Sequence, residues 1–226
     1  MRFYINLIVI LSFCKLFSQE NPNFTALDSL YREDQFYIGI NYGSLQKRPA
    51  GISQDKFTPS FSLGFLRDMP INKTRTIAIA AGLGYAINNF NQNILFTKIN
   101  SQADYKAIGT DYTKNKLTLH YIELPLELRW RTSTPESHIF WRIYTGFKVS
   151  YLVYDHSKYT DGQQEIIVKR NKDLNPIQYG PYIAIGRNTW NLYAYYGLSP
   201  LFKAGEVNDN RIEMTTLAMG LHFYIL

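Results

Sequence analysis

Five ionic residues recur at even spacings in two consecutive stretches of the sequence. Glu123, Glu127 and Arg129 occur in the first stretch, and Arg142 and Lys148 occur in the second. Because the side chains of an extended strand alternate between two faces, the members of each group share one face. Two nearby carboxylates could act as an acid and a base, whereas carboxylates beside guanidinium and ammonium groups form ion pairs. We interpret the five residues as a structural cluster of paired charges, with a narrow polar pore or proton path as the alternative.

Residues that commonly bind metals or act as nucleophiles are sparse. The four histidines show no metal-ligand spacing. They are His120, His138, His156 and His222. The pair His156-Ser157, together with His120, is the nearest candidate for a catalytic histidine and serine, but no Gly-x-Ser-x-Gly elbow accompanies it. We therefore predict no catalytic residues, no metal site and no cofactor.

The ionic residues lie opposite an apolar face. Between Ile122 and Arg131, aliphatic residues and Trp130 alternate strictly with charged residues and Pro125, which predicts a strand with one apolar and one ionic face. Seven further segments repeat this alternation, and eight strands close naturally into a barrel. The eight segments are 36–42, 60–65, 77–87, 117–131, 139–153, 178–186, 190–198 and 217–225.

The connections between these segments alternate in length. The four after odd-numbered segments are long, at 43–59, 89–116, 154–177 and 199–212. The other three are short, at 66–76, 132–137 and a tight turn near Arg187-Asn188. In an up-and-down barrel this places long loops on one rim and short turns on the other, as in outer-membrane barrels. The predicted fold class is all-β, an eight-stranded antiparallel up-and-down transmembrane β-barrel, with a lipocalin-like soluble barrel as the alternative.

Two patterns favour lipid outside the barrel. The face opposite the apolar residues of segment 77–87 contains only alanine and glycine, which suits a crowded lumen rather than a solvated surface. Aromatic residues also gather on the apolar face at the rim with the short turns, where they would form an interfacial girdle. These residues are Phe36, Phe65, Trp130, Trp141, Trp190 and Phe223. Tyr42, Tyr85, Tyr151 and Tyr179 would form the opposite girdle.

The amino terminus predicts export, and one strand predicts a local irregularity. Residues 1–18 resemble a secretory signal, residues 19–34 form a polar arm, and residues 35–226 form the barrel. The apolar set changes phase between Tyr121 and Ile122, so we expect a bulge or local break there. Pro125 and Pro181 cannot donate hydrogen bonds to a strand ladder.

The stretch Tyr121-Ile122-Glu123-Leu124-Pro125-Leu126 resembles the tyrosine, aliphatic, glutamate, aliphatic, proline strand of the PorT-like outer-membrane β-barrels typical of Bacteroidetes. Thr145-Gly146-Phe147 before Tyr151-Leu152, the glycines at 180 and 186, and Tyr196-Gly197-Leu198 are also similar. The match spans nearly the whole mature chain. The resemblance implies an outer-membrane location in a Gram-negative bacterium and, for some members, a role in type IX protein secretion and gliding.

Together these observations predict a non-enzymatic outer-membrane barrel that acts as a scaffold or accessory in the cell envelope. The alternatives are a narrow pore for ions or small solutes and a lipid-modifying outer-membrane enzyme. The expected partners are outer-membrane lipid and lipopolysaccharide, and other envelope or secretion proteins. The net charge of +6 is not arranged as a basic stripe, so we expect no nucleic-acid partner.

Overall fold

The computed structural model describes residues 32–54, 56–99, 102–109, 111–132 and 140–225, which all belong to one compact unit, Tyr31–Leu226. Eight long strands dominate this unit, and each overlaps one of the eight predicted segments. They are β1 (Gln35–Gln46), β2 (Pro59–Pro70), β3 (Ile77–Asn91), β6 (Lys114–Arg131), β7 (Trp141–Thr160), β9 (Ile177–Arg187), β10 (Trp190–Tyr196) and β13 (Thr215–Ile225). The predicted all-β fold is confirmed.

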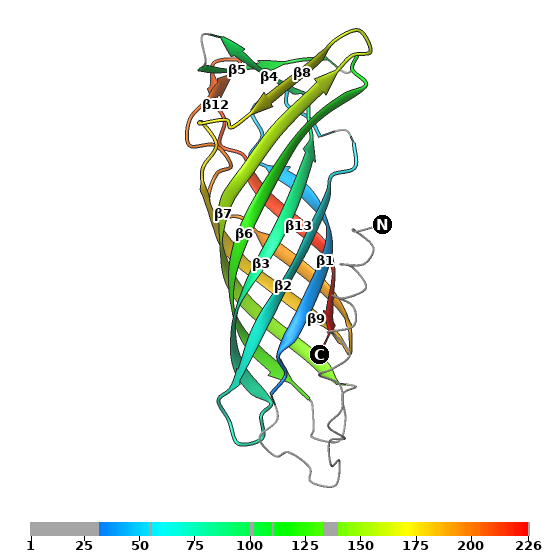
Figure 1. The fold of residues 1–226 in the computed structure, drawn as a ribbon, viewed down its shortest axis with the longest axis vertical. Coiled ribbons are helices and arrows are strands. Elements are labelled where there is room, and N and C mark those ends of the chain that lie inside the picture. Colours follow the sequence, from blue (N-terminus) through cyan, green and yellow to red (C-terminus); the bar gives the residue numbers. More distant parts are fainter. Residues whose placement is uncertain (1–31, 55, 100–101, 110, 133–139, 226) are drawn as a thin grey trace, which may run out of the picture. The chain divides into compact units, whose positions relative to one another are not determined.

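The long strands form a closed antiparallel barrel, as Figure 1 shows. Each strand pairs with the next long strand along the chain, and β1 completes the circle by pairing with β13. Long connections meet at one rim, which we call the loop rim, and short ones at the other, the short-turn rim. Most of the predicted turn 132–137 lies outside the described residues. No helix in the described part of the chain is long and apolar enough to cross a membrane.

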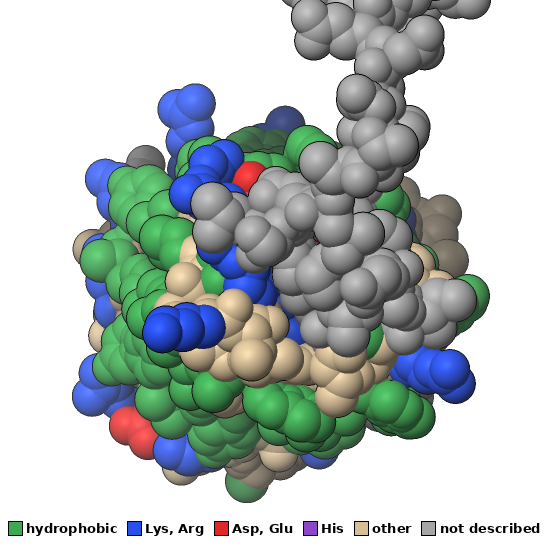
Figure 2. Space-filling view, turned by 90° about the horizontal axis from the view of Figure 1, so that it is seen from below, with side chains coloured by type: hydrophobic (Ala, Val, Ile, Leu, Met, Phe, Trp, Pro, Cys, Tyr) green, Lys and Arg blue, Asp and Glu red, His purple; other side chains and the backbone are tan. Residues whose placement is uncertain are grey.

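The two faces of the barrel wall differ sharply in chemistry. On β6, Leu124 and Leu126 point outward with 57% and 55% of their surface exposed, whereas the inward-facing Glu123 and Glu127 are 3% and 2% exposed. Seen from the short-turn rim, hydrophobic side chains surround the barrel, and Lys and Arg side chains lie both near the middle of the view and around its outline (Figure 2). At 45° tilt, the outward apolar run from Ile122 to Trp130 spans on the order of 20 Å, close to the apolar band of a membrane barrel.

A bulge lies close to the predicted position. His120 pairs with Tyr154 and Tyr121 pairs with Leu152, so Val153 is an extra residue on β7. The bulge reverses the facing of β7 beyond Val153, while β6 keeps its facing and points Tyr121 into the barrel in the same row as Glu123. The bulge prediction is confirmed one residue from the expected junction. The apolar phase change on β6 reflects a change in what the barrel contains, from ionic to apolar side chains.

Five short strands, none of which was predicted, occur in the long connections. They are β4 (Ile94–Ile99), β5 (Gln102–Ala107), β8 (Glu165–Lys169), β11 (Glu206–Val207) and β12 (Asn210–Arg211). β4 pairs with β5, β11 pairs with β12, and β8 extends the sheet beyond β7. Together with the ends of β6 and β7 beyond the bulge they form a folded region at the loop rim, the top of Figure 1, which we call the head.

The predicted signal segment, residues 1–18, lies outside the described residues. Of the predicted polar arm, residues 32–34 are described, and two of them bind to the short-turn rim. The Asp34 carboxylate accepts a hydrogen bond from the Asp68 backbone N–H at 2.8 Å and pairs with Arg67 at 2.9 Å. Glu33 reaches the charged interior of the barrel, as described below.

Candidate functional site

A buried network of charges fills the barrel at the short-turn rim. Asp68, on the inward face of β2, accepts hydrogen bonds from Arg129 at 3.0 Å and from two nitrogens of Arg131 at 2.9 Å. Arg129 also donates to Glu127 at 2.7 Å and to the backbone carbonyl of Glu33 at 3.2 Å, and the Glu33 carboxylate lies 3.6 Å from Arg131. All five side chains are buried. Three carboxylates thus compensate two guanidinium groups, as buried charges require.

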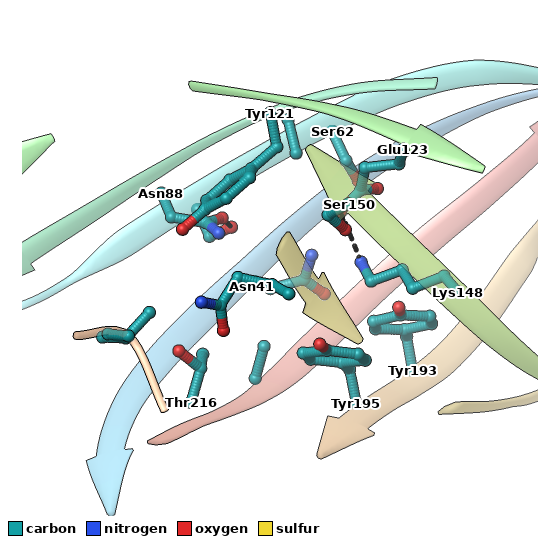
Figure 3. A pocket seen from close by; sticks show the side chains of 15 residues that line it. Asn41, Ser62, Asn88, Tyr121, Glu123, Lys148, Ser150, Tyr193, Tyr195 and Thr216 are labelled. Carbon is teal, nitrogen blue, oxygen red and sulfur yellow. Dashed lines mark hydrogen bonds and ion pairs between the residues drawn. The ribbon is translucent and has the colours of Figure 1, made fainter. Parts of the chain in front are cut away.

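A second ion pair lies nearer the middle of the lumen. The Lys148 ammonium donates to the Glu123 carboxylate at 2.7 Å, and the Ser150 hydroxyl lies 3.4 Å from the same oxygen (Figure 3). β6 and β7 bring these residues together because Glu123 lies opposite Ser150 in the strand register. The Lys148 ammonium also lies 4.5 Å from the centre of the Tyr195 ring, which is a favourable cation–π distance.

Arg142, the fifth member of the predicted charge cluster, is held differently. Its guanidinium group stacks on Phe140 at 4.5 Å, and the rings of Tyr144 and Tyr224 lie at 5.6 Å. Among the described residues its Nε and Nη1 atoms have no hydrogen-bond partner. The structure therefore places all five predicted residues in the lumen and pairs four of them with carboxylate or cation partners, while aromatic rings contact the fifth.

Tyrosine side chains fill most of the remaining lumen. Tyr193 stacks on His222 with ring centres 3.6 Å apart, and the Tyr182 hydroxyl donates to Glu127 at 3.0 Å. Tyr37 crosses beside the glycine at 84, where a Cβ atom would collide with its hydroxyl. Cavities of about 30 and 10 Å³ remain between these side chains, enough for a few water molecules. Both cavities are lined by Glu123, Lys148 and Tyr193.

An apolar core fills the barrel at the loop rim. Its fully buried members include Phe90 of β3, Phe96 of β4, Leu119 of β6 and Phe202 of the last long connection. Phe96 and Phe202 stack with ring centres 6.1 Å apart, and the edge of Tyr105 meets both rings. The core combines inward-facing strand residues with loop residues, as in a water-soluble domain. It separates the charged lumen from the solvent at the loop rim.

The predicted aromatic girdle residues all lie on the outer face near the short-turn rim. Trp130, Trp141 and Trp190 are exposed, Phe36 and Phe65 pack 5.0 Å apart, and Phe223 packs against Trp190 at 4.7 Å. The four tyrosines of the opposite girdle are also exposed on the outer face. The six residues of the first girdle come from six strands, β1, β2, β6, β7, β10 and β13, so aromatic side chains are distributed around the circumference.

The structure does not assemble the candidate histidine and serine. His120 and His156 lie on the outer wall with ring centres 6.3 Å apart, whereas Ser157 is buried on the opposite face of β7. His222 is buried in the lumen, and His138 lies outside the described residues. No group of metal-binding side chains occurs among the residues that were described.

The head carries a polar cleft of about 530 Å³ at the loop rim. Lys98, Arg170 and Lys172 supply three cations, and Asn171 and Asp173 line the same cleft. Tyr105 fixes one wall, because its hydroxyl donates to Asp173 at 2.9 Å and accepts from Asn171 at 2.8 Å. Burial raises the pKa of Tyr105, so this hydroxyl remains a donor at physiological pH. We call this feature the head cleft.

Sequence reasoning missed Asp68, Arg131 and Glu33 as members of the buried network. Asp68 falls in the predicted turn 66–76 because Arg67 interrupts the apolar face of β2. The inward row nevertheless keeps its spacing of two, through Ser60, Ser62, Gly64, Leu66 and Asp68. The head cleft was also missed, because its residues come from two separate long connections. No periodic pattern in the sequence indicates that these connections meet.

One comparison with known proteins, the match to a family model, agrees with the fold. A family model described as the outer membrane protein beta-barrel domain matches residues 17–203. No curated protein matches the chain at a significant level. Among solved structures, the attachment invasion locus protein Ail of Yersinia pestis is 13% identical and covers 86% of this chain and 100% of its own, with a TM-score of 0.40. Ail in complex with the heparin analogue sucrose octasulfate gives the same identity and coverage, with a TM-score of 0.39.

The family match covers most of the chain, including seven of the eight barrel strands, and the eighth strand closes the same barrel. The apolar exterior, the ionic interior and the contrast between long loops and short turns are those of a protein that resides in the outer membrane. The chain therefore belongs to the outer membrane protein beta-barrel domain family.

Proposed function

We propose that this protein is a non-enzymatic scaffold of the outer membrane whose head binds another component of the cell envelope. The observation that carries the proposal is the difference between the membrane-spanning part of the barrel and the head. The membrane-spanning part is filled by its own side chains, and the head is a folded apolar-core structure that presents a cationic cleft. A filled barrel offers no path for a solute, so the surface available for function is the head.

The partner that fits best is a protein with an acidic surface. Lys98, Arg170 and Lys172 provide positive charge around the head cleft, and exposed cations of this kind steer acidic partners. The resemblance to PorT-like barrels supports a place in type IX protein secretion and gliding. Under this proposal the barrel anchors the head at the cell surface, where it contacts the secretion apparatus.

A charge-reversal variant in the native organism tests the scaffold proposal. Lys98→Glu/Arg170→Glu/Lys172→Glu reverses the head cleft, and Lys47→Glu/Arg48→Glu/Lys203→Glu reverses three exposed cations elsewhere on the loop-rim connections. Each variant is expressed in a deletion strain, and secreted protein, gliding and detergent sensitivity are measured at matched levels of folded barrel. We expect the cleft variant to resemble the deletion and the control to resemble wild type.

Two results would count against the scaffold proposal. If the deletion strain itself secretes, glides and resists detergent normally, the protein has no role in these envelope processes. If the cleft variant restores every phenotype, the head cleft is not the binding surface, and the partner contacts another part of the head.

Separate measurements test the pore and enzyme alternatives. The charged lumen motivated a pore, but paired charges, tyrosines and the head core fill it. We therefore expect planar bilayers that contain the purified barrel to show no stepwise conductance. The enzyme alternative predicts altered lipid A or phospholipid profiles in the deletion strain, and we expect both profiles to match wild type.

A further inference from the structure

The outer wall of the head carries a row of basic residues just above the tyrosine girdle. On β6, His120 is the next outward-facing residue after Ile122, and Lys116 follows further up the strand. On β7 and β8, His156, Lys158 and Lys169 face the same way. We call these five residues together with Lys114 the wall patch. At the tilt of a membrane barrel it covers a belt on the order of 10 Å tall, at the level of lipid headgroups.

The strand register places basic residues directly opposite one another in the wall patch. Lys116 lies opposite Lys158, and His156 lies opposite Lys169. The ammonium groups of Lys116 and Lys158 repel one another in this position, and Glu165 offsets the charge of Lys158. Burial and then the positive charge of Lys116 lower the pKa of His156, so this side chain is neutral at physiological pH and the lysines carry the positive charge of the patch.

Carboxylates on the strands of this wall compensate only part of this charge. Glu165, at the upper end of β8, pairs with Lys158 at 2.6 Å. Asp155 faces the interior and accepts a hydrogen bond from the Asn171 backbone. Lys114, Lys116 and Lys169 therefore face outward without a carboxylate partner on β6, β7 or β8, all of which the structure describes completely.

An apolar groove on the lipid-facing wall leads up to the wall patch. It lies over β1, β2 and β3, has a volume of about 690 Å³, and is lined by Ile38, Leu63, Leu83 and Tyr85 among others. The Tyr85 hydroxyl lies 2.7 Å from His120 Nδ1, so the upper end of the groove and the lower margin of the patch share a hydrogen bond. A groove in hydrocarbon and a cationic belt above it match the acyl chains and the phosphate of one lipid.

We propose that the wall patch binds the phosphate of a phosphorylated lipid of the outer leaflet, with an acyl chain of the same lipid in the groove below. The phosphate supplies negative charge for Lys114, Lys116 and Lys169, which have no carboxylate partner on β6, β7 or β8, whereas Lys158 is already paired with Glu165. The site lies on the wall and is separate from the head cleft. Its occupant is therefore independent of the partner proposed for the head.

Retention of lipid A in native mass spectrometry tests this site. The mature protein is reconstituted in nanodiscs of phosphatidylcholine that contain a minor fraction of bisphosphorylated lipid A. The protein is then released from the nanodiscs, and the mass of the protein with its bound lipid is measured. We expect wild type to retain lipid A. The variant Lys116→Gln/Lys158→Gln/Lys169→Gln should retain at least about tenfold less, because each lysine near an anionic surface contributes roughly a fivefold gain in affinity. Lys47→Gln/Lys106→Gln/Lys203→Gln removes the same charge from exposed positions at the loop rim and should retain lipid A as wild type does.

Two further measurements test whether retention requires the phosphate of the lipid and the positive charge of the protein. Wild type should not retain lipid A from which both phosphates have been removed, and the Lys→Arg triple variant should retain the phosphorylated form. Heat-modifiable migration on a gel checks that each variant is folded. Equal retention of phosphorylated and phosphate-free lipid A by wild type, or undiminished retention by the folded Gln variant, would overturn the proposal.

Discussion

At the scale of single residues, Asp68 is the carboxylate that joins the two buried arginines of the network. Its two oxygens accept hydrogen bonds from Arg129 and Arg131, and both arginines are fully buried. Asp68→Asn would leave two desolvated guanidinium groups with a neutral partner. We expect a loss of about 3–5 kcal/mol in the free energy of unfolding, measured by denaturant titration in detergent micelles.

Asp34→Asn is the matched control for Asp68→Asn, because the Asp34 ion pair with Arg67 is largely exposed. Its expected cost is about 0–1 kcal/mol. Equal costs for the two substitutions would show that the network at the short-turn rim is hydrated rather than dry.

Asp161 provides a pH-dependent contact in the turn between β7 and β8. The backbone N–H groups of Gln163 and Gln164 donate to its carboxylate at 2.9 and 3.0 Å and, Gln163 first, lower its pKa from 3.8 to about 2. Since the folded pKa lies below the unfolded one, the contact stabilises the turn fully above pH about 4 and is lost as the pH falls towards 2. A carbon-13 titration of the carboxylate should give a midpoint near 2, and a midpoint at the ordinary value would contradict the turn geometry.

Residue types and spacing alone predicted which ionic side chains face inward, because strand alternation is local. Their partners could not be predicted in the same way. Asp68 and Arg131 meet across β2, β3 and β6, and Glu33 approaches from the amino-terminal arm, so their contacts depend on barrel closure. Arg142 was expected to pair with carboxylates and instead stacks on Phe140, since Glu127 and Asp68 already bind the other arginines.

At the scale of strands, the bulge at Val153 reverses which residues of β7 face outward. Below it, alternate residues such as Val149 and Tyr151 face outward, and above it Tyr154 and His156 face outward. Deleting Val153 would move every residue from Tyr154 to Thr160 to the opposite face. Asp155 and Tyr159 would leave the interior, and the cations of β7 would enter the head core.

We therefore expect the Val153 deletion to produce a barrel that inserts into the membrane with an unfolded head. Limited proteolysis of reconstituted protein should cleave the loop-rim connections rapidly and leave a protected membrane-spanning fragment. Val153→Ala keeps the number of residues and should resist protease as wild type does. A protease-resistant head in the deletion variant would show that β7 tolerates either register.

All eight long strands were predictable because each alternates over at least six residues. The five short strands were not, since β4, β5 and β8 obtain their apolar partners from other connections rather than from a periodic pattern of their own. The phase change at Tyr121 was visible in the sequence and correctly indicated a bulge. The cause of the phase change on β6 is the apolar core inside the barrel above the membrane, which could not be predicted because loop residues supply part of it.

At the scale of the whole molecule, the membrane determines which face of the sheet is apolar. Leu126 lies midway between Trp130 and Ile122 on the outer face of β6. Leu126→Arg would place a charge near the bilayer midplane and should cost about 2–4 kcal/mol in the free energy of unfolding from lipid vesicles. Ile71→Arg, in the turn after β2, is the control, and near the interface it should cost at most about 1 kcal/mol.

Similar costs for Leu126→Arg and Ile71→Arg would mean that hydrocarbon does not surround the barrel at Leu126. The same pair of variants therefore tests the assignment of the outer face without reference to the lumen or to the head. It also distinguishes this protein from a soluble barrel with the same strand order.

The reversal of apolar facing at Tyr121 has a consequence for how deeply the protein sits in its bilayer. If the molecule sank by a few residues, His120, Lys116 and Lys169 would enter hydrocarbon, and if it rose, Ile122, Leu124 and Tyr151 would meet water. Displacement in either direction is therefore opposed by the same short segment of two strands. The immersion depth is encoded locally, and a foreign peptide grafted onto the head should leave it unchanged.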